Sequence, residues 1–254
     1  KTKILVTLGP STEQEPVLRE LINAGMNVAR LNFSHGDYEE HGARVATVKK
    51  LREEMKKPVA LMLDTKGPEI RTGMIEGDKI HLEAGKSITL TTTTVTGTAD
   101  LLSISFDRLP SMLESGSTIL LDDGLIQLAV EHIPDDKTIV CKILNSGSIK
   151  SRRGVNVPKL NLNMSNPTEK DRDDIIFAAR NDFDFIAVSF TESEDTIRRV
   201  KAILDIEGKP DIKVIAKIEN HAGLNNFDDI LEVADGIMVA RGDLGVELLP
   251  EEVP

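Results

Sequence analysis

Aromatic residues and cysteine are scarce in this sequence. Aromatic residues make up 3% of its 254 residues, with one Tyr and no Trp, so any core must be built mainly from aliphatic side chains. Cys141 is the single cysteine, which excludes an internal disulfide, and its neighbours Ile139 and Ile143 predict a buried thiol. The sequence also lacks an apolar run of the roughly 18 residues that a membrane-spanning helix needs.

Positive charge is in short supply as well. The 31 Lys and Arg residues face 42 Asp and Glu residues, which gives a formal net charge of −11. Because nucleic acids and anionic membrane surfaces are bound through Lys and Arg, both are disfavoured as partners. The opening Lys1-Thr2-Lys3 leads directly into a strand-like run instead of a signal sequence. We therefore expect a soluble, cytoplasmic protein.

Short runs rich in Val, Ile and Leu alternate with amphipathic segments. Six runs are predicted to be strands: 4–7, 28–34, 59–65, 185–190, 213–219 and 236–243. Helices are predicted from Ser11 or Thr12 to Gly25, from a capping box of Asp37 and Glu40 to Pro58, over 168–181, and from Ser193 to Gly208. This repeated alternation predicts a parallel sheet.

One interval in the strand spacing is far too long. Successive strands start roughly 25 to 30 residues apart, but about 125 residues separate the third and fourth. Between about residues 71 and 157 the pattern changes to period two, with strands predicted at 87–92, 101–105, 118–121, 126–133 and 138–144. The domain prediction is therefore a first barrel part, 1–67, an inserted all-β lid, 68–165, and a second barrel part, 166–254.

Two α/β folds fit this organisation. A closed (β/α)₈ barrel of the TIM type needs about 250 residues without insertions. Once an insert of roughly 90 residues is removed, the part of this sequence that could form the barrel is shorter than that. The chain is thus either a TIM-type barrel that is incomplete, with six strands, or an open doubly wound sheet.

Polar side chains alternate with apolar ones near the carboxyl ends of three runs, where ligands bind in such folds. They are Arg30, Asn32 and Ser34; Lys217 and Glu219; and Arg241 and Asp243. Strands of a parallel sheet are normally buried on both faces, so these groups require partners or a ligand. The alternative is a buried network of structural ion pairs.

Glu219 and Asp243 end consecutive strands, which are expected to be neighbours. Two adjacent carboxylates repel unless a cation lies between them, and a few carboxylates completed by water and substrate oxygens suit Mg²⁺. Lys217 would then stabilise a phosphoryl group or an enolate. Further oxygen donors, suited to a second and monovalent cation, are Asn32, Ser34 and Asp64. The chemistry indicates a metal-assisted enzyme that acts on a small anion.

Three further segments carry charge in turns. Residues 63–73 contain Lys66 and Arg71 among Gly and Pro, which suits a hinge with phosphate contacts. In the insert, the basic turn 152–154 could reach a nucleotide phosphate, and the turn 122–124 is acidic. The alternative for each is a solvated linker or surface turn.

Taken together, these segments resemble pyruvate kinase. The matching segments are 7–11, 27–36, 63–72, 121–126, 154–158, 215–220 and 235–245, and Lys217-Ile218-Glu219-Asn220 is similar to the family's signature element. The resemblance implies a TIM-type barrel with a lid, and transfer of the phosphoryl group of phosphoenolpyruvate to ADP, giving pyruvate and ATP in glycolysis. It also implies Mg²⁺ or Mn²⁺ and K⁺ as cofactors, and a homo-oligomer at full length.

The resemblance assigns a role to most of the strand-end residues. Lys217 and Arg30 would be catalytic and bind substrate. The backbone of Gly242 and Asp243 would bind the substrate carboxylate. The divalent cation would be held by Glu219 and Asp243, and K⁺ by Asn32, Ser34, Asp64 and Thr65. Glu69 matches the K⁺-dependent type of the family. The nucleotide would meet Asn32, His35, Arg71, Arg153 and Asp123.

The chain departs from the family pattern at Lys159, where Gly is usual, at Ser165, where Pro is usual, and at Arg153, where Lys is usual. It also ends just after the sixth predicted strand. One alternative to an active pyruvate kinase is therefore an inactive truncated fragment that still binds substrate or metal. A chemically different alternative is a metal-dependent pyruvate-enolate lyase or aldolase, which also pairs Glu and Asp on barrel strands.

Overall fold

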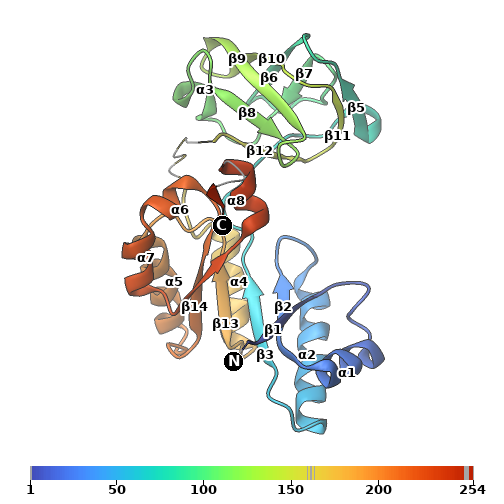
Figure 1. Cartoon of the computed structure of the whole chain (residues 1–254), viewed down its shortest axis with the longest axis vertical. Coiled ribbons are helices and arrows are strands. Elements are labelled where there is room, and N and C mark those ends of the chain that lie inside the picture. Colours follow the sequence, from blue (N-terminus) through green and yellow to red (C-terminus); the bar gives the residue numbers. More distant parts are fainter. Residues whose placement is uncertain (1, 159, 161, 163, 249–251, 254) are drawn as a thin grey trace. The chain divides into compact units, whose positions relative to one another are not determined.

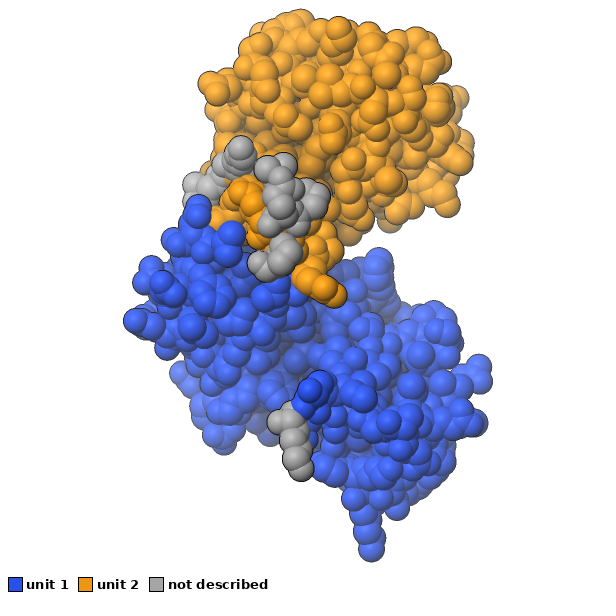
Figure 2. Space-filling model, in the orientation of Figure 1, with its two compact units in different colours: residues 1–68, 165–219, 223–240 blue, residues 69–164, 220–222, 241–254 orange. Residues whose placement is uncertain are grey.

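The computed structural model describes residues 2–158, 160, 162, 164–248, 252 and 253, and these form two compact units (Figure 2). Unit 1 comprises residues 1–68, 165–219 and 223–240, and unit 2 comprises residues 69–164, 220–222 and 241–254. The chain therefore leaves unit 1 after Pro68 and returns to it at Ser165. The segment 241–254, which the sequence assigns to the barrel, groups with unit 2.

Unit 1 is built on a parallel sheet of six strands in the order β1-β2-β3-β13-β14-β15 (Figure 1). The strands are β1 (Ile4–Leu8), β2 (Met26–Asn32), β3 (Ala60–Asp64), β13 (Phe185–Val188), β14 (Lys213–Ile218) and β15 (Gly236–Val239). The connecting helices are α1 (Glu15–Ala24), α2 (Tyr38–Glu54), α4 (Glu169–Arg180), α5 (Glu194–Ile206), α6 (His221–Asn225) and α7 (Phe227–Val233). This is the predicted incomplete α/β barrel with six strands.

Local signals explain most of these boundaries. The carboxylate of Asp37 accepts a hydrogen bond from Glu40 N at 2.9 Å and caps α2, as predicted. Helix α1 ends at Gly25, whose φ of 110° suits glycine. The predicted start of α1 was wrong. Thr12 Oγ1 is used in a turn, where it accepts from Gly9 N at 2.9 Å, so the helix begins only at Glu15.

The core of unit 1 is aliphatic, as the composition requires. Along β2, Ala29, Leu31 and the following Phe33 are almost completely buried, whereas Arg30 and Asn32 are partly exposed on the opposite face. The apolar face of this strand thus packs into the core of unit 1. Its polar face is left for the site described below.

Unit 2 contains a seven-stranded sheet in the order β4-β12-β8-β9-β10-β6-β7 and a two-stranded sheet of β11 and β5. Its strands are β4 (Ile70–Arg71), β5 (Lys79–Leu82), β6 (Ser87–Thr91), β7 (Leu101–Ser103), β8 (Thr118–Leu121), β9 (Ile126–Asp135), β10 (Thr138–Ile143), β11 (Gly147–Lys150) and β12 (Gly154–Asn156). The 3₁₀ helix η1 (Glu76–Asp78) and the helix α3 (Leu109–Met112) complete the insert. Cys141 is completely buried, as predicted, and burial raises the pKa of its thiol to about 12.

The predicted end of the sixth strand was wrong. Strand β15 stops at Val239, and residues 241–247 form helix α8 (Arg241–Glu247). The neighbouring strand β14 ends at Ile218, whose carbonyl accepts the last ladder hydrogen bond, from Ala240 N at 3.3 Å. Among the described residues no strand pairs with the backbone beyond this point, and its polar groups are satisfied in a helix. Arg241 and Asp243 are therefore helical, not alternating strand residues.

Candidate functional site

A buried lysine lies at the centre of a polar cluster at the carboxyl ends of β3, β13 and β14. Lys217 Nζ lies 3.0 Å from Asp64 Oδ1 and 2.8 Å from Glu219 Oε1, and it donates to Ser189 Oγ at 2.7 Å. All four side chains are nearly or fully buried. Each comes from a strand or from the residue after it, so the parallel sheet itself brings them together.

Arg30 extends this cluster toward the first strand. Its Nε donates to Asp64 Oδ2 at 2.5 Å, and its Nη1 donates to Thr7 Oγ1 at 2.7 Å. Asp64 thus lies between two cations, one on each carboxylate oxygen. The strand-end charges of Arg30, Asp64, Lys217 and Glu219 are thus paired with one another, as in the ion-pair network given above as the alternative, and their binding of a ligand stays a prediction.

The electrostatics of Lys217 follow from this arrangement. Burial alone would lower the pKa of Lys217, but the adjacent carboxylates of Glu219 and Asp64 outweigh burial and raise it. The side chain therefore stays charged at neutral pH. It holds a fixed positive charge at a site with little water, where such a charge interacts most strongly.

Glu219 is fixed from two sides. Its Oε2 accepts a hydrogen bond from Phe190 N at 2.7 Å, while Oε1 faces Lys217. Phe190 has a φ of 50°, in the left-handed region that is uncommon for a non-glycine residue. This backbone conformation aims the amide at the carboxylate.

The oxygen donors predicted to bind a monovalent cation lie at adjacent strand ends. Asn32 is the register partner of Asp64, and its Oδ1 accepts from Ser34 N at 3.0 Å. The Thr65 side chain is turned to Ser189, because its Oγ1 accepts from Ser189 N at 3.0 Å. The sheet thus gathers these residues, and their binding of K⁺ stays a prediction.

The residues predicted to meet nucleotide phosphates belong to unit 2. Arg71 Nε donates to Glu69 Oε2 at 2.7 Å and its Nη1 to Arg152 O at 2.9 Å. The Arg153 guanidinium lies 3.7 Å from the Asp122 carboxylate. These contacts hold both arginines at the paired strands β4 and β12.

The acidic turn of unit 2 lies near the start of α8. Burial and the nearby carboxylates of Asp122 and Asp243 raise the pKa of Asp123.

Asp243 and Glu219, the predicted divalent-cation pair, belong to different units, so that pair stays a prediction. Within the described residues, no group of three or more His, Cys, Asp or Glu side chains could hold a metal ion.

Comparison with known proteins decides the family. The sequence model described as "Pyruvate kinase, barrel domain" matches residues 1–254. The chain belongs to the pyruvate kinase family. A pyruvate kinase from Bacillus licheniformis is 49% identical over 255 residues, covering 100% of this chain and 44% of the relative. One from Staphylococcus aureus strain MRSA252 is 48% identical and is covered to 43%.

A solved structure agrees with the pyruvate kinase assignment. The crystal structure of a pyruvate kinase from Cryptosporidium parvum matches with a TM-score of 0.93 and 42% identity, covering 100% of this chain and 53% of that chain. The chain thus spans less than half the length of the curated relatives above and about half of this one.

Two members of the cluster were not predicted from the pyruvate kinase resemblance or from the strand pattern. Ser189 contacts Lys217 and Asp64, and Thr7 contacts Arg30. Ser189 could have been found, since it is a polar residue near the carboxyl end of the fourth run, 185–190. Thr7 offered less signal, because a lone Thr at the end of a short strand is common.

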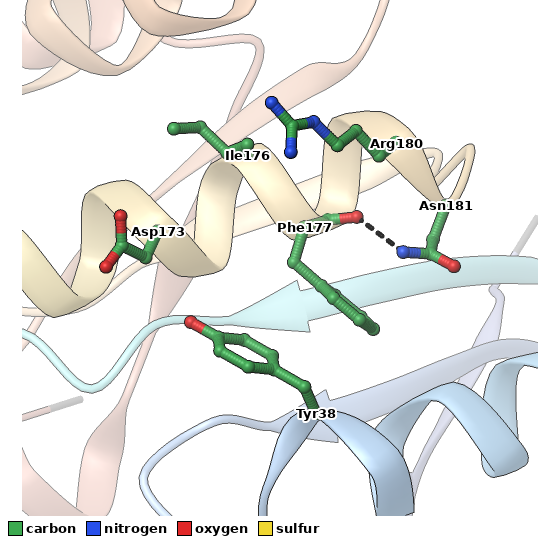
Figure 3. Close-up of a pocket in the computed structure, with 6 residues that line it drawn as sticks. All are labelled: Tyr38, Asp173, Ile176, Phe177, Arg180 and Asn181. Atoms are coloured by element: carbon green, nitrogen blue, oxygen red, sulfur yellow. Dashed lines mark hydrogen bonds between the residues drawn. The ribbon is translucent and has the colours of Figure 1, made fainter.

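Unit 1 also has a surface cavity of about 360 Å³ between α2 and α4 (Figure 3). Tyr38 lines it from α2, and the α4 side has Phe177, whose ring stacks on Tyr38 with centroids 5.1 Å apart. None of the predicted site residues lines it.

In the described part of the chain, no helix has the length and apolar character of a membrane span.

Proposed function

We propose that this chain supplies the barrel site and the inserted domain of a pyruvate kinase, a cytoplasmic enzyme that transfers the phosphoryl group of phosphoenolpyruvate to ADP. The observation that carries the proposal is Lys217, buried and charged between Asp64 and Glu219. Family membership supports the same reaction. The relatives are longer than this chain, and the proposed homo-oligomer concerns a full-length protein of that kind.

Lys217 and Arg30 would act on the substrate through their charge. Phosphoryl transfer depends mainly on positioning and on stabilising negative charge, with little covalent chemistry for the protein. Lys217 Nζ would stabilise the transferring phosphoryl group, and Arg30 would orient it. Asp64 already holds both positively charged side chains, so little reorganisation is needed when the reaction occurs.

The cations fit the residues by chemistry. Mg²⁺ binds through one or two carboxylates completed by water and substrate oxygens, and Glu219 and Asp243 offer two carboxylates. A bound Mg²⁺ would supply positive charge beside the substrate oxygens. Asn32, Ser34, Asp64 and Thr65 offer oxygen donors only, which suits K⁺.

In unit 2, Arg71 and Arg153 would bind the phosphates of ADP, with Asp123 near the cation-bound phosphates. Arg71 lies in β4, and Arg153 directly precedes β12, the strand that pairs with β4, which suits a fixed phosphate contact. His35, after β2, would meet the adenine end. The backbone of Gly242 and Asp243, at the start of α8, would bind the substrate carboxylate.

The test is ATP formation from phosphoenolpyruvate and ADP, with Mg²⁺ and K⁺ each present or omitted. We expect turnover that needs both cations in a protein that contains this chain together with the rest of a full-length relative. In that protein, Lys217→Met should abolish phosphoryl transfer and leave substrate binding largely intact. Unchanged turnover in Lys217→Met would refute the role of Lys217. The 254-residue chain alone, if folded and inactive, would be the binding part of the enzyme.

A further inference from the structure

The segment that leads back from unit 2 into α4 sends three side chains to three different loops of unit 1. These are Asn166, Lys170 and Asp171. The loops follow β2, β3 and β13, which are consecutive neighbours in the sheet. Each of these loops borders residues of the proposed site. The segment therefore contacts the backbone of all three loops, although its own side chains are not among the proposed site residues.

Asn166 holds the loop after β13. Its Nδ2 donates to Ser189 O at 3.0 Å and to Phe190 O at 2.9 Å, and the side chain is about nine-tenths buried. Ser189 contacts Lys217, and the amide of Phe190 binds Glu219. Asn166 thus holds the backbone of Ser189 and Phe190, and these two residues contact the charged groups of Lys217 and Glu219.

Asp171 holds the loop after β3. Its Oδ1 accepts from Gly67 N at 3.0 Å, while Oδ2 accepts from Thr168 N and Oγ1 in the cap of α4. Both oxygens of this buried carboxylate are therefore used. Gly67 in turn packs against Ser189, since a Cβ on Gly67 would lie 2.9 Å from the Ser189 Cβ. The loops after β3 and β13 are thus held against each other.

Lys170 holds the loop after β2. Its Nζ donates to Phe33 O at 3.0 Å and to Asp174 Oδ2 at 2.6 Å. Phe33 lies between Asn32 and Ser34, which offer oxygens for the proposed monovalent cation. A fixed Phe33 carbonyl constrains the backbone from which both of those side chains extend.

We propose that Asn166, Lys170 and Asp171 are positioning residues that set the three site loops for cation binding. The proposal rests on the proposed function, because it takes Glu219 as a divalent-cation ligand and Asn32 and Ser34 as ligands of K⁺. None of the three touches the reacting atoms in this role. They act through the backbone of Phe33, Gly67, Ser189 and Phe190.

The first experiment measures Mn²⁺ binding to the folded chain by electron paramagnetic resonance. Asn166→Ala should weaken Mn²⁺ binding roughly 10-fold, the usual size of an effect from a group that orients a metal ligand. The matched control is Asn181→Ala. Asn181 Nδ2 also donates to a carbonyl, Phe177 O at 2.9 Å, but at the far end of α4. The control should lose stability in urea and keep its Mn²⁺ affinity.

The second experiment needs no ligand. Amide hydrogen exchange at Phe190 should speed up in Asn166→Ala and stay unchanged in Asn181→Ala. A third measurement, K⁺-dependent phosphoenolpyruvate binding by calorimetry, should show a raised K⁺ requirement in Lys170→Met with a smaller change in Mn²⁺ affinity.

The outcomes separate the two proposals. If the unmodified chain binds no Mn²⁺, the proposed function of this chain fails. If it binds Mn²⁺ and Asn166→Ala binds it equally well, the positioning role alone is overturned. Unchanged exchange at Phe190 in Asn166→Ala overturns the positioning role in either case.

Discussion

At the scale of single residues, Lys217 shows how a buried charge is kept. Two carboxylates face its ammonium group, and a serine hydroxyl accepts from it, so the cost of burial is offset by specific partners. Removing one partner of such a group is far more costly than removing an exposed charge, because the others stay buried without compensation.

The pKa of Lys217 predicts how stability depends on pH. Its folded pKa is raised above the ordinary 10.5. The stabilisation from its charge is therefore fully present below that value and is lost as the pH rises through the higher folded pKa. We expect the urea midpoint to fall in strongly alkaline solution more steeply in the unmodified chain than in Lys217→Met. Parallel curves for the two proteins would contradict this.

Gly67 is a second residue with a specific requirement. Its φ of 69° is left-handed, and a Cβ would lie 2.8 Å from Phe190 Cδ2. We expect Gly67→Ala to lower the free energy of unfolding by more than about 1 kcal/mol, from backbone strain and steric overlap together. Gly85→Ala is the control, since Gly85 has a φ of 85° and no neighbour within 4 Å of a Cβ. A loss in Gly67→Ala no larger than in the control would show that the contact is unimportant.

At the scale of elements, helix starts were predictable wherever a side-chain cap is encoded. Asp37 and Thr168 both accept from the backbone of the third helical residue; the cap at Asp37 was predicted, and the predicted range 168–181 begins at Thr168. The signal at Thr12 failed, because the same hydroxyl can close a turn instead. Helix α8 was missed because residues 236–243 are apolar enough for a strand, and only the end of β14 stops the pairing.

The cap of α4 can be tested directly. Thr168 and Asp171 form a reciprocal capping box, so Thr168→Ala should cost about 1 kcal/mol of stability. Ser193 is a matched control, since it stands at the N-cap of α5 and makes no side-chain capping bond. Ser193→Ala should therefore cost clearly less. Equal losses in chemical denaturation would show that the box contributes nothing beyond an ordinary N-cap.

At the scale of the whole molecule, the described residues form two hydrophobic cores with no member in common. One is built on the parallel sheet of unit 1 and the other on the sheets of unit 2. The sequence predicted the insertion because a long gap with a period-two pattern interrupts a regular strand spacing. It could not predict the cluster around Lys217 in full, because the Ser189 and Phe190 contacts depend on strand order and backbone conformation.

Separate cores predict separate responses to cavities. Leu128 is completely buried in unit 2, and Leu61 is completely buried in unit 1. Leu128→Ala should destabilise unit 2 by about 2–5 kcal/mol and speed amide exchange there, with little change in unit 1. Leu61→Ala should give the reverse pattern. Equal acceleration in both units for either variant would show that they unfold as one.

The pairing at the ends of the insert bears on the order of folding. Strands β3 and β13 are neighbours, yet Leu61 and Asp184, where they meet, are 123 positions apart. Closing so long a loop in an open chain is slow, since contacts of large sequence separation are reached late. In the folded insert, β4 pairs with β12 and Thr72 N donates to Arg153 O, so its two ends are already adjacent. Pulse-labelled refolding should find β4 and β12 protected before β3 and β13. An insert that folds early would then keep its two ends adjacent, so that only a short connection would have to close when β3 pairs with β13.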